Sequence, residues 1–483
     1  MKLHRNLRAA VVASALLLAA CASTNGLAPE ASLHDANSLA AQKALSAATL
    51  SSSAWPGSDW WTGYNDPQLD ALIDEALAEN PTLRVAEART RQALAFAATQ
   101  KAVLYPQVNG DFDLSRQRAP EHGLTPPPLG GRWGTLYQLQ ATLDWELDLW
   151  GKNRDAYESA LGQARAAEVD AYAARLALSV GIAQAYVQLD RAYLLLDVAQ
   201  ATLKERDQIY ALTRDRNAAG IDSRLELKQA EGALPATREQ IQQLQERIGL
   251  TRNTLAALLG AGPDRGLAIA RPVADTLRPV TLPSTVPAEL IGRRPDIVAQ
   301  RWRVEAADKD IAGAKAAFYP DVNLVGLIGL QSFGAAGFLS AASRMVGLGP
   351  AVSLPIFDGG RLRGNLAGAD ASYDIAVEQY NALLADALRD IVDQLTSFAS
   401  VQAQHHEQAQ ALADAQEAYD LAMLRYREGI GNYLQVLSAE SPLLEQQSLE
   451  ADLRARDLEI SISLVRALGG GFTAPAGPLA AAR

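Results

Sequence analysis

The sequence of 483 residues is poor in cysteine and in aromatic residues, and it lacks an apolar run long enough to span a membrane as a helix. Its single cysteine, Cys21, excludes an internal disulfide and a cysteine metal cluster. Aromatic residues make up only 6% of the chain, whereas alanine is abundant. This composition favours long, closely packed helices over a thick globular core.

The sequence also lacks the motifs of a catalytic or nucleic-acid-binding protein. It has no glycine-rich phosphate loop and no nucleophile motif, and the adjacent His405 and His406 do not have the i, i+4 spacing of a helical metal site. The formal charge is −11, and it falls to −14 without the three cations of the first twenty residues. We therefore expect no enzyme activity, no cofactor, no metal and no nucleic-acid partner.

The first residues resemble the signal of a bacterial lipoprotein. Three cations precede an apolar stretch over residues 9–20, and a Leu-Ala-Ala-Cys sequence ends at Cys21. We expect residues 1–20 to be a cleaved signal peptide and Cys21 to carry a diacylglycerol and an amide-linked acyl chain such as palmitate. Ala22 and Ser23, rather than an aspartate, come directly after Cys21, which favours the outer membrane over the inner membrane. Residues 21–58 are expected to form a loosely ordered, lipid-anchored segment.

One stretch of the sequence occurs twice. The segment Arg216–Glu231 reappears 209 positions later as Arg425–Glu440, so the chain is a tandem duplication. Each copy places a glycine and then a capping residue between two helix-like runs: Gly220 and Ser223 in the first copy, Gly429 and Asn432 in the second. Because glycine readily closes a helix and the capping residue starts the next one, each copy predicts a tight helical hairpin.

Two other segments change from a helical to an alternating pattern. From Tyr137 to Leu149 the odd positions are apolar and the even positions are mostly polar, which predicts a β-hairpin over 106–150 with one apolar and one polar face. This alternation is typical of membrane barrel strands. The second copy predicts a hairpin over 320–358, in which Pro350 indicates an edge strand or a bulge.

The repeats order the whole chain. A long helical pattern follows each hairpin and ends near Asn217 or Arg427, which corresponds to roughly 100 Å of helix. The expected organisation is a signal peptide (1–20), an anchored segment (21–58), a first repeat (59–262, tip 217–223), a proline-rich linker (263–287), a second repeat (288–471, tip 428–432) and a disordered tail (472–483).

Several stretches resemble the TolC family of outer-membrane factors, in particular its lipid-anchored NodT/OprM-like members. Between residues 60 and 471 they are, in order, WWTGYNDPQLDALIDEALAENPTL, WELDLWGKNR, RRPDIVAQRWRVEAADKDIAGAKAAFYPDVNL, LPIFDGGRLRG, RYREGIGNYLQVLSAE and ALGGG. The resemblance implies an α+β membrane protein with a tandem-repeat TolC-like fold. It implies a homotrimer whose chains each give four strands to one 12-stranded β-barrel, continued by a long periplasmic α-helical barrel.

The same resemblance implies a function. Such a protein is the outer-membrane channel, or exit duct, of a tripartite efflux pump that exports drugs or other small molecules. Its partners would be a periplasmic adaptor of the membrane-fusion type, an inner-membrane efflux transporter of the RND or MFS type, and outer-membrane lipid. The duct of a type I secretion system stays open as an alternative.

Elementary constraints lead part of the way to the same assembly. Four strands per chain cannot close a barrel, and an open sheet edge has no hydrogen-bond partners in hydrocarbon, so the chains must associate. Two chains would give eight strands and a filled lumen, whereas three would give twelve strands and room for a water channel. The resemblance selects three.

Candidate functional residues fall into three groups. The expected lipid anchor is Cys21. The hairpin tips, expected to dock the adaptor and to form the gate, carry Gly220, Ile221, Ser223, Tyr426, Gly429, Ile430, Asn432 and Gln435. The barrel lumen is expected to be lined by Asp111, Asp113, Asp144, Glu146 and Asp148, whose spacing of two places neighbours on one strand face. We interpret these acids as a polar lining rather than as catalytic pairs.

The resemblance also bears on the gate. In TolC-like proteins, carboxylates just after the tip glycine line the closed entrance, but Gln435 and Ser438 stand in the matching places here. The constriction is therefore expected to use other acids near the tips: Glu226, Glu231, Asp420 or Glu440. Arg425 and Tyr426 match the family's RY pair, which is expected to tie neighbouring hairpins together.

Two other classes of protein remain possible from the sequence. Long alanine-rich helices alone would allow a lipid-anchored periplasmic coiled-coil scaffold without a pore, but the two amphipathic hairpins argue against it. An outer-membrane enzyme with a barrel would need a catalytic constellation that the sequence lacks.

The lipoprotein interpretation predicts the fate of one variant. Cys21→Ser should abolish lipid labelling and leave a mis-processed precursor, because the acylated thiol is gone. Metabolic labelling with a radioactive fatty acid, together with the mass of the mature N-terminus, checks this. A mature chain that begins elsewhere would contradict it.

Overall fold

The structure is a computed structural model that describes residues 23–35, 39, 55–122, 130–273 and 292–473. Cys21 and the tail from residue 474 lie outside the described residues. The chain divides into two compact units, one formed by Met1–Leu33, Arg89–Ala167 and Ala299–Asn381, the other by His34–Ala88, Glu168–Val298 and Ala382–Arg483. Each unit is considered in turn.

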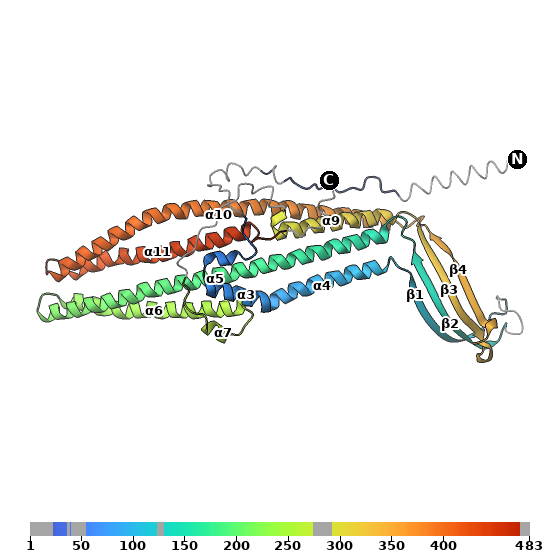
Figure 1. Cartoon of the computed structure of the whole chain (residues 1–483), viewed down its shortest axis with the longest axis horizontal. Coiled ribbons are helices and arrows are strands. Elements are labelled where there is room, and N and C mark those ends of the chain that lie inside the picture. The colour runs from blue at the N-terminus through green and yellow to red at the C-terminus, as the bar shows by residue number, and fades with distance from the viewer. Residues whose placement is uncertain (1–22, 36–38, 40–54, 123–129, 274–291, 474–483) are drawn as a thin grey trace. The chain divides into compact units, whose positions relative to one another are not determined.

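The described elements repeat along the chain (Figure 1). In order they are η2 (Trp60–Tyr64), α3 (Pro67–Glu79), α4 (Pro81–Ala102), β1 (Gln107–Arg118), β2 (Trp133–Glu146), α5 (Lys152–Ala218), α6 (Arg224–Leu258), α7 (Pro263–Leu267), α9 (Pro295–Ala316), β3 (Asp321–Phe333), η3 (Ala335–Gly337), η4 (Ala341–Ser343), β4 (Arg344–Ser353), α10 (Arg361–Arg427) and α11 (Tyr433–Ala467). Helices α4 and α9 each have 22 residues, α5 and α10 each have 67, and α6 and α11 each have 35. The predicted tandem duplication is confirmed.

The first unit contains a four-stranded antiparallel sheet in the order β1-β2-β3-β4. Both predicted hairpins are present, and Pro350 lies in the edge strand β4, as its lack of an N–H predicts. None of the described strands covers the outer edge of β1 or of β4. The sheet is therefore open on both sides within one chain (Figure 1).

Small residues let the helices of the first unit approach closely. A Cβ atom on Gly162 of α5 would lie 3.0 Å from the Cβ of Ala306 on α9. Lys309 of α9 forms an ion pair with Glu158 of α5 at 2.6 Å, and the side chain of Gln300 donates to the carbonyl of Ala376 on α10 at 2.9 Å. These contacts hold α9 against α5 on one side and against α10 on the other.

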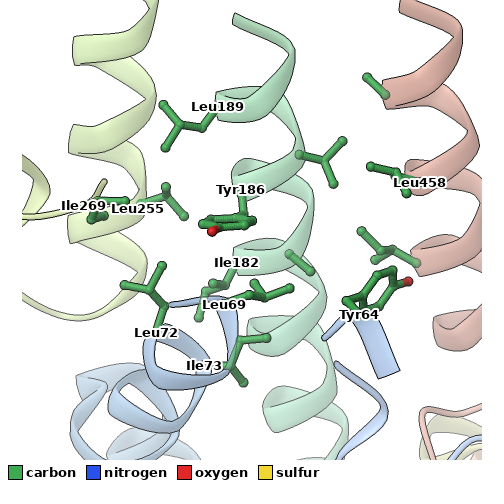
Figure 2. Packing of buried hydrophobic residues seen from close by; sticks show 14 of the residues in the cluster. Tyr64, Leu69, Leu72, Ile73, Ile182, Tyr186, Leu189, Leu255, Ile269 and Leu458 are labelled. Atoms are coloured by element: carbon green, nitrogen blue, oxygen red, sulfur yellow. The ribbon is translucent and has the colours of Figure 1, made fainter. Parts of the chain in front are cut away.

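The second unit has its main core around α5 (Figure 2). Asp66 caps α3 by accepting from the N–H groups of Gln68 and Leu69, and Pro67 fits the first helical position. The same carboxylate accepts a hydrogen bond of 2.6 Å from the hydroxyl of Tyr186. The apolar face of α3 packs against α5, and the labelled core residues are Tyr64, Leu69, Leu72, Ile73, Ile182, Tyr186, Leu189, Leu255, Ile269 and Leu458.

Two expectations of little order are wrong, and the expected linker contains one short helix. Pro263–Leu267, at the start of that linker, forms α7, with Pro263 at its first position after Gly262. Phe472, expected in a disordered tail, is buried with its ring 5.4 Å from that of Tyr172. Residues 23–33, expected to be loosely ordered, are hydrogen-bonded to α10. None of the described helices is long and apolar enough to cross a membrane.

The sheet register predicts which substitutions would destabilise the sheet in a membrane. Leu143 lies opposite Val108 and Gly326 on the apolar face, so Leu143→Arg should destabilise the assembled protein by about 2–4 kcal/mol if this face meets lipid. Thr142→Arg, one residue away on the other face, is the matched control and should cost less. Urea unfolding in lipid vesicles measures both. Equal losses, or a stable folded monomer in detergent, would contradict the assignment.

Candidate functional site

The two predicted hairpin tips are present with their predicted caps. Gly220 and Gly429 adopt φ of +74° and +77°, the left-handed conformation that glycine reaches without a Cβ clash. Ser223 and Glu226 form a capping box at the start of α6. Asn432 caps α11 by accepting a hydrogen bond of 3.1 Å from the N–H of Gln435.

A buried polar network joins the two tips of one chain. The guanidinium of Arg216 makes two hydrogen bonds to the carboxylate of Asp222, at 2.9 and 3.1 Å, and donates to the carbonyl of Tyr426 at 2.9 Å. The Tyr426 hydroxyl donates to Asp222 at 2.7 Å and lies 2.7 Å from the hydroxyl of Thr213. We call Thr213, Arg216, Asp222 and Tyr426 the tip latch.

Burial makes the tip latch a strong interaction. Tyr426 and Thr213 are fully buried, and the Arg216 guanidinium lies 4.6 Å from the centre of the Tyr426 ring. A charge-assisted bidentate pair with a cation–π contact satisfies these groups at a site from which water is excluded. The tip latch therefore ties the first hairpin to α10 through hydrogen bonds from side chains to side chains and to one backbone carbonyl.

The protonation states of the tip latch are fixed over a wide pH range. Burial alone would raise the pKa of Asp222, but hydrogen bonds from Arg216 and Tyr426 and the guanidinium charge outweigh it and hold this pKa below its usual 3.8. Burial raises the pKa of Tyr426 to about 12. The stabilisation from Asp222 is thus present above pH 3.8 and is lost as the pH falls through the lowered value. That from neutral Tyr426 is present up to pH 10 and is lost near 12.

The structure corrects how the tip residues were assigned. Tyr426 was expected to tie neighbouring hairpins, and within the chain it does so through Asp222, which sequence reasoning missed. The sequence does contain a signal for Asp222. Arg216 has the counterpart Arg425 in the second copy, whereas the counterpart of Asp222 is Gly431. An acid that is present in only one copy, near an arginine present in both, indicates that the two tips differ in their interactions.

Each tip also presents the same pair of exposed apolar side chains. Ile221 and Leu225 are 63% and 64% exposed on the first tip, and their repeat counterparts Ile430 and Leu434 are 70% and 58% exposed on the second. Exposed large apolar residues at matching positions indicate a contact surface rather than chance. We call these four residues the tip surface.

The acids proposed for a constriction near the tips have local partners. Glu440 is buried and accepts two hydrogen bonds from Arg206, at 2.8 and 3.1 Å. Arg206 also donates to Thr237 at 2.8 Å, so α5, α6 and α11 meet there. Glu226 belongs to the capping box, and Glu231 pairs with Lys228 at 2.5 Å. The buried position of Glu440 contradicts a constriction role, because its carboxylate is used within the helix bundle.

Four of the five acids predicted on one strand face do share it. Cross-strand pairing places Asp111 opposite Gln140 and Asp113 opposite Gln138, on the face that also carries Asp144 and Glu146. The prediction for Asp148 is wrong, because β2 ends at Glu146. The Asp148 carboxylate instead accepts from the N–H groups of Asn153 and Arg154, where it satisfies the first turn of α5.

Aromatic residues gather at both ends of the sheet. Near the helices, the Trp145 indole donates to the carbonyl of Leu104 at 3.1 Å, and Trp150 stacks on Tyr319 with ring centres 4.8 Å apart. At the other end, Phe338 contacts the rings of Phe112 and Tyr137. An apolar band between two aromatic groups is the pattern of a strand region that spans a bilayer.

No group of three or more histidine, cysteine or acidic side chains among the described residues is placed to hold a metal ion.

Comparison with known proteins gives a consistent result. A family model described as "Outer membrane efflux protein" matches residues 72–261 and 286–470. Fusaric acid resistance protein FusA of Burkholderia cepacia is 42% identical over 369 residues, 75% of this chain and 69% of that protein. Multidrug resistance outer membrane protein MdtP of Escherichia coli (strain K12) is 34% identical over 435 residues, 88% of each.

Solved structures share the fold. The outer membrane protein VceC of Vibrio cholerae superposes with a TM-score of 0.81 at 38% identity and covers 86% of this chain and 100% of that one. The outer-membrane channel OprN superposes with a TM-score of 0.82 at 28% identity and covers 92% and 97%.

The tip latch predicts a graded loss of local stability. Asp222→Asn should lower the free energy of local opening at the tips by about 3 kcal/mol, because it breaks a buried ion pair and leaves Arg216 under-compensated. Tyr426→Phe removes one hydroxyl and should cost about 1 kcal/mol. Asp215→Asn is the control, since Asp215 is exposed and pairs with its neighbour Arg214 outside the tip latch. Hydrogen exchange of the tip amides measures all three, and an Asp222→Asn effect no larger than the control would refute the latch.

Proposed function

The chain belongs to the outer membrane efflux protein family, and we propose that three copies of it form the exit duct through which a tripartite pump releases drugs or other small molecules across the outer membrane. The observation that carries this proposal is a four-stranded sheet with two open edges, one apolar face and one face that carries the acids of β1 and β2. Outer-membrane factors of this family are trimers that work with an adaptor and an inner-membrane transporter. FusA and MdtP are named for resistance to fusaric acid and to multiple drugs, which supports small molecules as the exported substrates.

The open sheet edges supply the reason for trimerisation. The outer edges of β1 and β4 present rows of N–H and C=O groups, which hydrocarbon cannot satisfy. Pairing β4 of one chain with β1 of the next closes a barrel of twelve strands. The apolar face with Leu143 then meets lipid, and Asp111, Asp113, Asp144 and Glu146 line a water-filled lumen.

The tips provide the gate and the docking site. A stretch of 67 helical residues, about 100 Å long, precedes each tip, so the tips serve a partner in the periplasm or the inner membrane. The tip surface of Ile221, Leu225, Ile430 and Leu434 docks the adaptor, which links the duct to a transporter of the RND or MFS type. The tip latch keeps the entrance closed until docking strains it. Gly220 and Gly429 act as hinges, because they absorb backbone rotation without a Cβ clash.

A lipid on Cys21 completes the anchoring. The diacylglycerol and the amide-linked acyl chain attached there hold the chain at the outer membrane, since each buried CH₂ contributes about 0.8 kcal/mol. The barrel fixes the orientation, and the lipid secures the chain before the barrel has closed.

Single-channel recording tests the duct directly. The purified protein in a planar bilayer should give discrete conductance steps, and Asp222→Asn should open more often than the native chain because its latch is weakened. Asp144→Asn should remain a channel but lose part of its preference for cations, since one carboxylate per chain leaves the lumen. Absence of conductance even in Asp222→Asn would exclude a duct and favour a scaffold without a pore.

The same preparation tests docking. Gly429→Val and Gly220→Val force a β-branched side chain into the left-handed region, so the tips should distort while trimer and barrel stay intact. Crosslinking to the adaptor and export should both be lost. Gly232→Val is the matched control, because Gly232 lies within helix α6 in open space. Unchanged adaptor crosslinking in the tip variants would refute docking at the tips.

A further inference from the structure

The N-terminal segment of the first unit makes specific contacts with α10. Arg363 donates from its two terminal nitrogens to the carbonyls of Ser23 and Asn25, the latter at 3.2 Å. One oxygen of Asp374 accepts from the backbone N–H groups of Glu30 at 3.0 Å and Ala31 at 2.9 Å. The side chain of Asn381 donates to the carbonyl of Ser32 at 3.0 Å.

These three side chains lie on one face of α10. Arg363 and Asp374 are 11 residues apart, close to three turns, and Asn381 follows 7 residues later, close to two turns. The bonded residues follow one another in the same order along the N-terminal segment and along α10, so the segment runs parallel to the helix. Every one of these bonds is made to the backbone of the segment. The contact therefore recognises an extended peptide and depends little on its side chains.

Two residues of the segment add to the fit. Gly26 has φ of +78° in a turn closed by a hydrogen bond of 3.2 Å from the N–H of Leu27 to the carbonyl of Thr24. The turn directs Leu27 against the apolar cluster of Phe318, Leu362 and Leu366. Backbone bonds on both sides of one apolar anchor are the arrangement of a peptide held in a binding groove.

We propose that Arg363, Asp374 and Asn381 form a clasp that fixes residues 23–32 as a strap on α10. The clasp begins at Arg363, two residues after the first residue of α10, close to the point where the chain leaves β4 and the sheet region. Because Ser23 is held there, a lipid on Cys21 would stay within two residues, at most about 7 Å of extended chain, of this junction. The strap thus turns a flexible tether into a fixed attachment at the level where sheet and helices meet.

The clasp explains why an alanine- and serine-rich segment is ordered at all. Its composition cannot bury enough apolar surface to fold alone. Charged partners on α10 offset the ordering cost, since hydrogen bonds to charged groups are stronger than neutral ones. The attachment part of this inference rests on the proposed lipid anchor, whereas the clasp itself does not.

Thiol accessibility tests the clasp in the full-length, membrane-inserted protein. Ala31→Cys supplies a reporter, since Ala31 is half-buried and bonds to Asp374 through its backbone N–H, and the only native cysteine is Cys21. A charged maleimide that cannot cross membranes supplies the probe. In vesicles that expose the periplasmic side, Asp374→Ala and Arg363→Ala should each speed the labelling of residue 31 by about tenfold or more. Asp374→Asn should give a smaller increase, because its carbonyl oxygen still accepts both N–H groups.

Asp370→Asn is the matched control. Asp370 lies on the same face of α10 between Arg363 and Asp374, it is buried, and neither of its carboxylate oxygens has a hydrogen-bond partner among the described residues. The variant removes an equal charge without removing a bond to the strap, so labelling should not accelerate. Acceleration equal to that of Asp374→Ala, or no acceleration in any clasp variant, would overturn the clasp.

A second measurement tests the attachment. A fluorophore on Asn25→Cys, quenched by nitroxide-labelled lipids, reports the depth of the strap in vesicles. Asn25 is exposed, so the label should leave the strap seated. A single depth in the native background and a broad distribution in Asp374→Ala are expected. An unchanged depth despite faster labelling of residue 31 would refute the attachment role and leave the clasp standing. Neither readout involves export, so failure here is distinguishable from failure of the duct.

Discussion

Unsatisfied backbone hydrogen bonds at the two outer edges of a four-stranded sheet are the constraint on which the rest of this molecule depends. One chain carries β1 and β4 with open edges, and a bilayer offers no water to satisfy them. A closed barrel must therefore be shared between chains. Once the barrel is shared, the helices that continue from the strands are also arranged as neighbours of a symmetric assembly, and a duct follows from the same requirement.

The second constraint is that very long helices need specific contacts along their length to stay packed together. Close contacts at small residues, such as Gly162 beside Ala306, bring the helices of the first unit near enough for van der Waals packing. In the second unit, buried polar ties such as Arg206 with Glu440 connect helices of both repeats. A bundle packed only through alanine would allow helices to slide. The buried ion pairs and the tip latch fix their register, because sliding by one turn would leave charges unpaired.

Much of this architecture was predictable from the sequence. The duplication, the hairpins, the lengths of α5 and α10 and the capping residues Ser223 and Asn432 follow from local patterns that involve neighbours in the chain. Asp222 and Asp148 did not follow, because their partners are chosen by geometry. Alternation placed Asp148 on the strand face, but the strand ends before it, and its carboxylate satisfies the first turn of a helix. Phe472 and the strap were expected to be disordered because their surroundings are rich in small residues. Their order comes from distant partners, Tyr172 and α10.

The tip surface has a consequence for the symmetry of any partner. The two tips of a chain carry the same isoleucine and leucine at equivalent positions, although the side chains behind them differ, with Asp222 in one copy and Gly431 in the other. In the proposed trimer, six tips would carry the same exposed isoleucine and leucine, whereas the buried Asp222 would occur only three times. A partner ring of six identical subunits would then meet six similar apolar contacts without distinguishing the two copies. The duplication has thus kept the exposed pair of each tip uniform while the residues packed behind it diverged.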